Sequence, residues 1–308
     1  MQAVIEQGTL RSYDLSFMET FLRVCRSELV LLGDSPMADL RARIVDGALV
    51  TSVRLGMRIR GRFVLPRDWI MLVYLQETDG AQSWCHGLPM GPGSCITVLP
   101  TGAAEFSLAA NSVALLALIP RRFLGEEAAS DPFSGSIDRL EPGIRVHAGA
   151  SAFHDATLRS LSDNTLSGEH LSQWLDMHRQ AEPLTSGVPL ASLRARRSRY
   201  QIFRKAEDFM LANMPRQIYM QEICDAAGTS ERTLRYAFDD LTGNSPGRYL
   251  SLLRLCAACR ALTRADATEL SVKSVALSCG LWDLSRFADS YRNVFGELPR
   301  DTLQRMTG

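Results

Sequence analysis

Five arginines lie within residues 54–67 of this 308-residue chain, and guanidinium groups bind phosphate and carboxylate well. Arg58, Arg60 and Arg62 alternate along a segment whose pattern is typical of a strand, so their side chains share one face. Like charges placed side by side repel each other unless an anion joins them. The pattern therefore predicts a binding site for an anionic effector, with these candidate residues: Arg54, Arg58, Arg60, Arg62 and Arg67.

Two other interpretations of this arginine cluster stay open. The guanidinium groups can form a solvated face, or one paired with acidic side chains of the same chain, and they can also contact the backbone of a nucleic acid. Residues 54–62 read twice as Arg-x-x-x-Arg, and this spacing resembles half of the cyclic di-nucleotide site of PilZ domains. The other half, Asp/Asn-x-Ser-x-x-Gly, is absent from the sequence. The resemblance makes cyclic di-GMP the sharpest candidate for the effector.

The residue types of catalytic and metal sites show no pattern that predicts an enzyme. The five histidines, at positions 86, 147, 154, 170 and 178, lack the His-x-His spacing of a cupin-like metal site, so we expect no metal and no cofactor. Cys256 and Cys259 form a C-x-x-C pair, but on a predicted helix with apolar neighbours, which is typical of core packing. No Gly-rich phosphate loop and no hydrolase motif is present.

Acidic and basic residues balance over the whole chain but not within its parts. The chain has 34 basic and 34 acidic residues, and a net charge of zero by itself argues against a nucleic-acid partner. Residues 194–308, however, hold 18 basic and 13 acidic residues, whereas residues 1–193 carry a net charge of −5. This asymmetry favours contact between nucleic acid and the C-terminal part.

Short runs rich in Val, Ile and Leu, separated by turn residues, predict a β-rich N-terminal domain. The predicted strands are residues 40–46, 48–57, 69–75, 94–99, 104–109 and 112–119. Their spacing suggests a small barrel or sandwich, with helices at 16–31, 151–161 and 167–182. We therefore expect an α+β protein with a β-barrel-like (cupin-like) domain over residues 1–182 for effector sensing and dimerisation. A linker over 183–198 follows, and then an all-α domain over 199–308.

The C-terminal domain contains an internal repeat. Residues 223–228 precede residues 275–280 by 52 positions, and Phe238, Gly243 and Pro246 precede Tyr291, Gly296 and Pro299 by 53 positions. Each copy is a short helix, a glycine turn and a longer helix, which is a helix-turn-helix arrangement. A connecting helix of about 19 residues spans about 28 Å, close to the ~34 Å between successive major grooves on one face of DNA.

These residues resemble the AraC-type (AraC/XylS) transcriptional regulators over about residues 200–305. The resemblance rests on residues 230–238 (SERTLRYAF), 242–246 (TGNSP), 275–287 (VALSCGLWDLSRF) and 295–299 (FGELP). It implies a double helix-turn-helix domain and an N-terminal domain that binds an effector. Leu281 and Tyr291 stand where the family has Phe, and Leu298 stands where it has Thr or Ser. Asp289 stands where the family often has an arginine facing the bases.

Polar side chains on the outward face of each second helix are candidates for DNA contact. Arginine pairs with guanine, threonine meets a thymine methyl group, and aspartate can accept from cytosine. The predicted DNA-contacting residues are Arg232, Thr233, Arg235, Tyr236, Trp282, Ser285, Arg286, Asp289 and Arg292. Each of the arginines can instead bind phosphate or remain solvated, and Asp289 can pair with Arg286 or Arg292.

Together these patterns predict a cytoplasmic DNA-binding regulator, an activator by family, that forms a homodimer and responds to an effector. No apolar run reaches the ~20 residues of a membrane span, and residues 1–11 lack the features of a secretory signal. Seven cysteines without regular spacing fit reduced thiols. The alternatives are a constitutive DNA binder whose N-terminal domain only dimerises and an enzyme with a DNA-binding appendage. Dependence of operator affinity on an effector separates the effector-responsive regulator from the constitutive binder.

Overall fold

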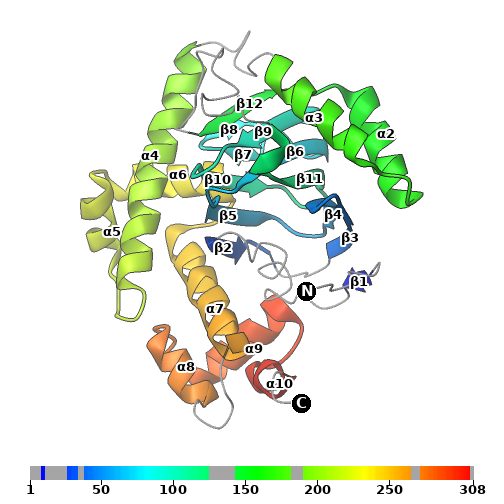
Figure 1. The fold of residues 1–308 in the computed structure, drawn as a ribbon. Coiled ribbons are helices and arrows are strands. Elements are labelled where there is room, and N and C mark those ends of the chain that lie inside the picture. The colour runs from blue at the N-terminus through cyan, green and yellow to red at the C-terminus, as the bar shows by residue number, and fades with distance from the viewer. Residues whose placement is uncertain are drawn as a thin grey trace.

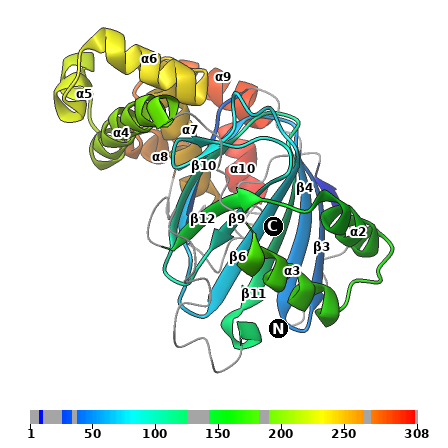
Figure 2. The same ribbon diagram turned by 90° about the horizontal axis from the view of Figure 1, so that it is seen from above.

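A computed structural model describes residues 8–10, 26–33, 38–124, 143–181, 190–264 and 271–305. Two antiparallel β-sheets lie at the centre, and helices cover them on opposite sides (Figures 1 and 2). One group of helices follows the sheets in the chain and packs on one of them, while the C-terminal helices extend from the other side. This is the α+β architecture that the sequence predicts.

Two sheets face each other in the N-terminal part. The seven-stranded sheet has the order β1 (Gly8–Leu10), β3 (Ala38–Val45), β4 (Ala48–Leu55), β11 (Val113–Pro120), β6 (Trp69–Glu77), β9 (Ser94–Val98) and β12 (Ile144–Ala148). The five-stranded sheet has the order β2 (Arg26–Leu31), β5 (Ile59–Val64), β10 (Ala103–Leu108), β7 (Trp84–Cys85) and β8 (Leu88–Pro89). All six predicted strands are present, because alternating apolar residues and turn residues specify them locally.

The predicted helix over residues 16–31 is wrong where it can be checked. Residues 26–31 form strand β2, which pairs antiparallel with β5, and residues 16–25 lie outside the described residues. The pairing sets Glu28 opposite Arg62 and buries Leu29 and Leu31 against the other sheet. These contacts come from residues 28 to 38 positions away, so the tertiary pairing overrides the local helical spacing.

Helices α2 (Ser151–Ser162) and α3 (Gly168–Gln180) match the predicted helices and cover the outer face of the seven-stranded sheet (Figure 2). A second apolar cluster lies beneath them, with Leu161, Leu171 and Trp174 packed on side chains of the sheet. Between β11 and β12 the chain forms the short 3₁₀ helix η1 (Arg121–Leu124).

The C-terminal part is helical throughout its described residues. Its helices are α4 (Leu190–Asn213), α5 (Met220–Ala227), α6 (Glu231–Thr242), α7 (Pro246–Arg264), α8 (Val272–Ser278), α9 (Leu284–Phe295) and α10 (Pro299–Arg305). Helix α4 already includes residues 190–198 of the predicted linker, and residues 182–189 lie outside the described part. The domain boundaries at 182 and 199 stay predictions.

Local signals explain where these helices begin and end. Gly228, Gly243 and Gly296 end α5, α6 and α9 in the left-handed conformation that glycine adopts without strain. Pro246 occupies the first position of α7, where its missing N–H does no harm. Among the described helices, none is both long and apolar enough to cross a membrane.

Candidate nucleic-acid interface and effector cavity

Helix α6 presents the first set of predicted DNA-contacting residues. The Ser230 hydroxyl accepts a hydrogen bond from the Thr233 N–H and so begins the helix. The inner face of α6 is fully buried, so the opposite face points to solvent. The exposed residues there include all four predicted contacts: Arg232, Thr233, Arg235 and Tyr236.

Two arginines of α6 differ in their surroundings. The Arg232 guanidinium lies 5.6 Å from the centre of the Tyr236 ring, which orders it without neutralising it. Arg235 donates from Nε to the Glu231 carboxylate at 3.0 Å, one helical turn earlier. Arg232 therefore has the less compensated charge and is the better placed of the two to meet a base or a phosphate.

Helix α9 presents the second set of predicted contacts. The Asp283 carboxylate accepts the Arg286 N–H at 3.0 Å and begins the helix, and Phe287, Tyr291 and Val294 are buried. The predicted residues are all exposed: Trp282, Ser285, Arg286, Asp289 and Arg292. A hollow between α9 and α7 is lined by Arg248, Arg254 and Arg286, among others, which concentrates positive charge beside this reading helix. The structure thus gathers each predicted set on one exposed helix, and the base contacts themselves stay predictions.

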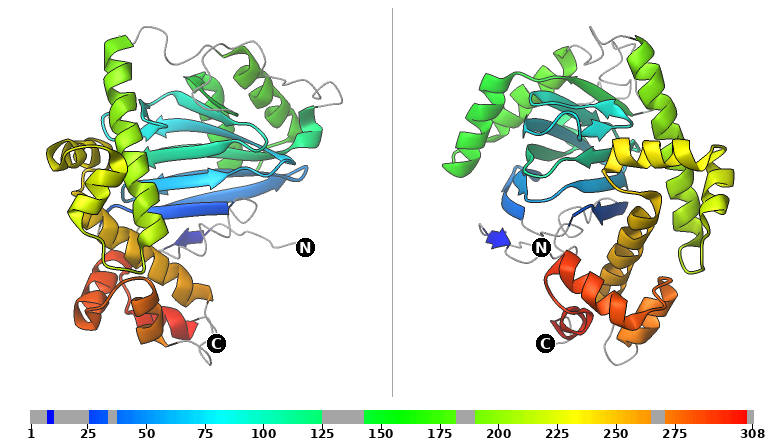
Figure 3. Two further views of the ribbon diagram at one scale, coloured as in Figure 1. Left: turned by 90° about the vertical axis from the view of Figure 1, so that its left-hand side faces the viewer. Right: turned by 180° about the vertical axis from the view of Figure 1, so that it is seen from behind.

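The five arginines of residues 54–67 lie in two different environments. Arg58, Arg60 and Arg62 share one face of the five-stranded sheet at strand β5, as the alternation predicts. That face is not open, because α4 and α6 of the C-terminal domain cover it (Figure 3). Arg54 lies on β4 in the other sheet and forms an exposed ion pair with Glu77, and Arg67 is exposed in the loop after β5.

Arg60 is the centre of a buried ion network between the two domains. It is 1% exposed, and its Nη2 lies 2.7 Å from a carboxylate oxygen of Glu105 on β10 and 2.7 Å from one of Glu207 on α4. Burial opposes the charge of Arg60, but Glu207, Tyr249 and Glu105 together outweigh it and raise the pKa of this guanidinium above its ordinary value. Burial likewise works against the ionised Glu105, yet Arg60 holds the pKa of that carboxyl below its ordinary value. The charge of Arg60 is therefore satisfied within the chain.

The hydroxyls of two tyrosines complete this network. Tyr200 donates to Glu105 at 2.8 Å, and Tyr249 donates to Glu207. Arg62 extends the network toward the surface with an ion pair to Asp208 at 2.9 Å. The interpretation of the cluster as a face paired within the same chain therefore fits these three arginines, and the anionic effector site stays a prediction.

The C-terminal end of the reading helix α6 is fixed to the β-sheet. The Leu241 carbonyl accepts from the Trp84 indole at 2.8 Å and from Arg58 Nη2 at 2.7 Å. Burial and the neighbouring Arg196 lower the pKa of Arg58 to about 10, so it stays charged at neutral pH. A cation at the C-terminal end of a helix is stabilising. The β-rich domain thus contacts the very helix that presents Arg232.

An apolar cavity lies between the two sheets. Its volume is about 70 Å³, several times the ~10–15 Å³ that one water occupies, and its surface contains no polar area. The lining comes from both sheets and includes Leu29, Leu55, Ile59, Phe63, Leu75, Cys85, Ala104, Phe106 and Leu108. Such a cavity suits a small apolar molecule, because water finds no hydrogen-bond partners there.

One layer of strands separates the cavity from helices α4 and α6. On β5, Ile59 and Phe63 line the cavity, while Arg60 and Arg62, together with Arg58 just before the strand, contact the helices. On β10, Phe106 lines the cavity, whereas its neighbour Glu105 binds Arg60. This alternation follows from the two-residue period of a strand. A molecule that displaces the strands from inside therefore acts directly on the side chains that hold α4 and α6.

The sequence predicted neither the cavity nor the side chains that pair with the arginines. Glu105 and Glu207 are 45 and 147 residues from Arg60, so no local spacing connects them. One signal was available: residues 103–108 alternate apolar and polar side chains and carry a glutamate among apolar neighbours, and a glutamate at such a position needs a partner.

Comparison with known proteins identifies relatives of the C-terminal domain. A family profile described as a helix-turn-helix domain matches residues 223–305. The XylDLEGF operon transcriptional activator 2 of Pseudomonas putida is 35% identical over 101 residues, which cover 33% of this chain and 64% of that protein. The HTH-type transcriptional activator RhaS of Escherichia fergusonii is 38% identical over 84 residues, 27% of this chain and 29% of its own.

A solved structure is similar over a comparable share of the chain. The crystal structure of a probable AraC family transcriptional regulator from Rhodopseudomonas palustris is 37% identical and covers 34% of this chain and 96% of its own, with a TM-score of 0.32. The chain spans about a third of the length of the first curated relative, the XylDLEGF operon transcriptional activator. The family profile and the curated relatives confirm the AraC-type resemblance of the C-terminal domain, and these relatives are transcriptional regulators rather than enzymes.

Proposed function

We propose that this protein is a transcriptional activator whose two helix-turn-helix units bind operator DNA, and whose β-rich domain binds a small apolar effector that controls this binding. The observation that carries the proposal is the single layer of strands with the apolar cavity on one side and the α4–α6 contact on the other. The proposal places the protein in the cytoplasm, with the DNA.

The exposed faces of α6 and α9 support DNA binding. Each presents a set of polar and basic side chains at the start of the second helix of a helix-turn-helix unit. The β-rich domain holds α6 by its other end, at the Leu241 carbonyl, so it leaves the reading residues uncovered. We propose activation rather than repression because these curated relatives are transcriptional activators.

The chemistry of the cavity supports an apolar effector over an anionic one. Cyclic di-GMP carries two phosphates, and the cavity offers no polar surface to receive them. Arg58, Arg60 and Arg62 are occupied by Leu241, Glu105, Glu207 and Asp208. Homodimerisation remains part of the proposal, with the exposed sides of α2 and α3 as the predicted contact.

Selection of bound fragments from genomic DNA, followed by gel-shift titration, tests the DNA-binding part. We expect Arg232→Ala to weaken specific binding by about 1–3 kcal/mol, while Arg122→Ala on η1, which lies on neither the DNA-binding helices nor the proposed dimer contact, leaves it unchanged. Equal losses in the two variants, or no selected sequence at all, contradict the proposal. Thermal-shift and gel-shift measurements with benzene and with cyclic di-GMP test the effector part, and a response to cyclic di-GMP alone contradicts it.

A further inference from the structure

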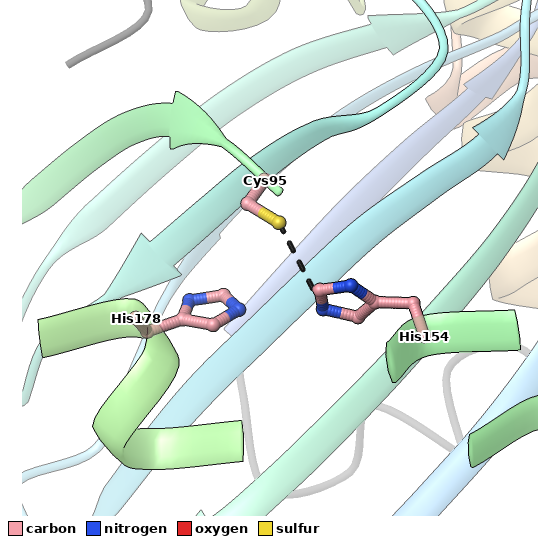
Figure 4. Close-up of side chains that lie close together, drawn as sticks. All are labelled: Cys95, His154 and His178. Carbon is pink, nitrogen blue, oxygen red and sulfur yellow. Dashed lines mark hydrogen bonds between the residues drawn. The ribbon is translucent and has the colours of Figure 1, made fainter. Parts of the chain in front are cut away.

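A buried group of metal-binding side chains lies outside the sites described above. Cys95 on β9, His154 on α2 and His178 on α3 point toward one another between the seven-stranded sheet and the two helices (Figure 4). All three are at most 1% exposed, and their donor atoms lie within 4.8 Å of one another. The Cys95 sulfur is 4.0 Å from His154 Nε2. Histidine spacing in the sequence predicted no metal site, because the three residues come from three different elements.

Hydrogen bonds hold both imidazoles in the same tautomer. His154 Nδ1 lies 2.7 Å from the Ala150 carbonyl, which can only accept, so Nδ1 carries the hydrogen and Nε2 has its lone pair toward Cys95. His178 Nε2 accepts from the Trp174 indole at 2.9 Å, so its Nδ1 carries the hydrogen and donates to Thr97 Oγ1 at 2.7 Å. Metal-binding histidines are held in this way, with the far nitrogen donating to an oxygen.

The donor set and its dimensions match a particular class of ion. A thiol and two imidazoles without a carboxylate ligand favour Zn²⁺ and similarly soft ions over Mg²⁺ or Ca²⁺. Zinc bonds of about 2.0–2.3 Å place neighbouring donor atoms about 3.3–3.8 Å apart, so donor atoms up to 4.8 Å apart must approach by at most about 1.5 Å. Arg145 adds positive charge nearby through its contact with the His178 carbonyl, and a cysteine thiolate offsets it.

We propose that Cys95, His154 and His178 bind one transition-metal ion of the Zn²⁺ class. Binding replaces the thiol proton of Cys95, which leaves to solvent, and the sulfur then bonds to the ion as a thiolate. The lone pair of His178 Nε2 then binds the metal in place of the Trp174 N–H, so the indole loses this acceptor and the lost hydrogen bond opposes metal binding. The ion would join β9 to α2 and α3 and so fix these helices to the sheet. This site is independent of the proposed effector cavity, which lies on the other side of the seven-stranded sheet.

Cobalt titration of the full-length chain tests the proposal. Co²⁺ serves as a spectroscopic probe, because a cysteine thiolate bound to it gives a charge-transfer absorption that imidazole does not. We expect the chelator-treated wild type to develop this band with one equivalent of Co²⁺, and Zn²⁺ to displace it. Tryptophan fluorescence changes in the same titration, and Trp174→Phe removes that change while keeping the absorption band.

Two variants and one control complete the test. Cys95→Ser removes the charge-transfer band, and His154→Gln weakens Zn²⁺ binding at least tenfold. Cys224→Ser, which changes a buried thiol of α5, leaves both signals intact. Absence of the band in wild type at high micromolar Co²⁺ overturns the proposal, whether or not the variants fold. Persistence of the charge-transfer band in Cys95→Ser overturns the proposal as well.

Discussion

Replacement of Glu207 by glutamine tests the coupling between the two domains. Glu207 lies on α4 and binds Arg60 of β5 across the interface at 2.7 Å, and both side chains are almost fully buried. Breaking a buried ion pair leaves an uncompensated charge and destabilises by about 3–5 kcal/mol. Arg60 keeps its second partner, Glu105, at 2.7 Å, and glutamine can still accept a hydrogen bond from Tyr249. We therefore expect a smaller loss of about 2–3 kcal/mol in the free energy of unfolding.

The adjacent residue supplies a matched control. Asp208 pairs with Arg62 at 2.9 Å, but its side chain is 48% exposed, and exposed pairs contribute about 0–1 kcal/mol. Urea unfolding of wild type, Glu207→Gln and Asp208→Asn measures the difference, and limited proteolysis shows whether the two domains have separated. Coupling through the Arg60–Glu207 pair is refuted if the two variants lose the same free energy of unfolding. It is also refuted if Glu207→Gln unfolds like wild type and is no more sensitive to protease.

Three further predictions follow from the DNA interface, the cavity and the ion network. Arg232→Ala relaxes the preference at one base position of the operator in a selection experiment, and an unchanged preference removes Arg232 from the base contacts. Leu75→Ala enlarges the cavity and lowers the free energy of unfolding by about 2–5 kcal/mol. Benzene then restores part of the lost stability in a thermal-shift assay. If it restores none, an apolar binding site is contradicted. Folding lowers the pKa of Glu105, so the stabilising effect of this carboxylate is complete above its ordinary pKa of 4.5 and is lost as the pH falls through the folded value. The free energy of unfolding of Glu105→Gln therefore depends less on acid pH than that of wild type. Identical pH profiles for the two proteins contradict this.

The helical domain was predictable because its signals are local. Ser230 begins α6, Gly243 ends it, and Pro246 starts the next helix, each within a few residues of the feature that it specifies. The alternation of Arg58, Arg60 and Arg62 also predicted correctly that they share one face of a strand. What covers that face was not predictable, because the acidic partner Glu207 is 147 residues away.

The same limit explains the incorrect helix and why spacing did not connect the three residues that we propose as a metal site. Strand β2 forms because β5 offers it an edge, and nothing within residues 26–31 records that edge. Cys95 and His154 are 59 residues apart and meet only when α2 packs on the sheet. Spacing rules detect sites whose ligands share one element or one loop, and this group draws its three members from a strand and two helices.

The most direct test of the central claim is the operator affinity of the full-length chain, measured with and without an apolar probe such as benzene, in wild type and in Glu207→Gln. The coupling through β5 predicts that the probe changes the affinity of wild type, and that this change is reduced or absent once the contact between Arg60 and Glu207 is broken. An affinity that is the same in all four measurements would contradict it and would leave a constitutive DNA binder.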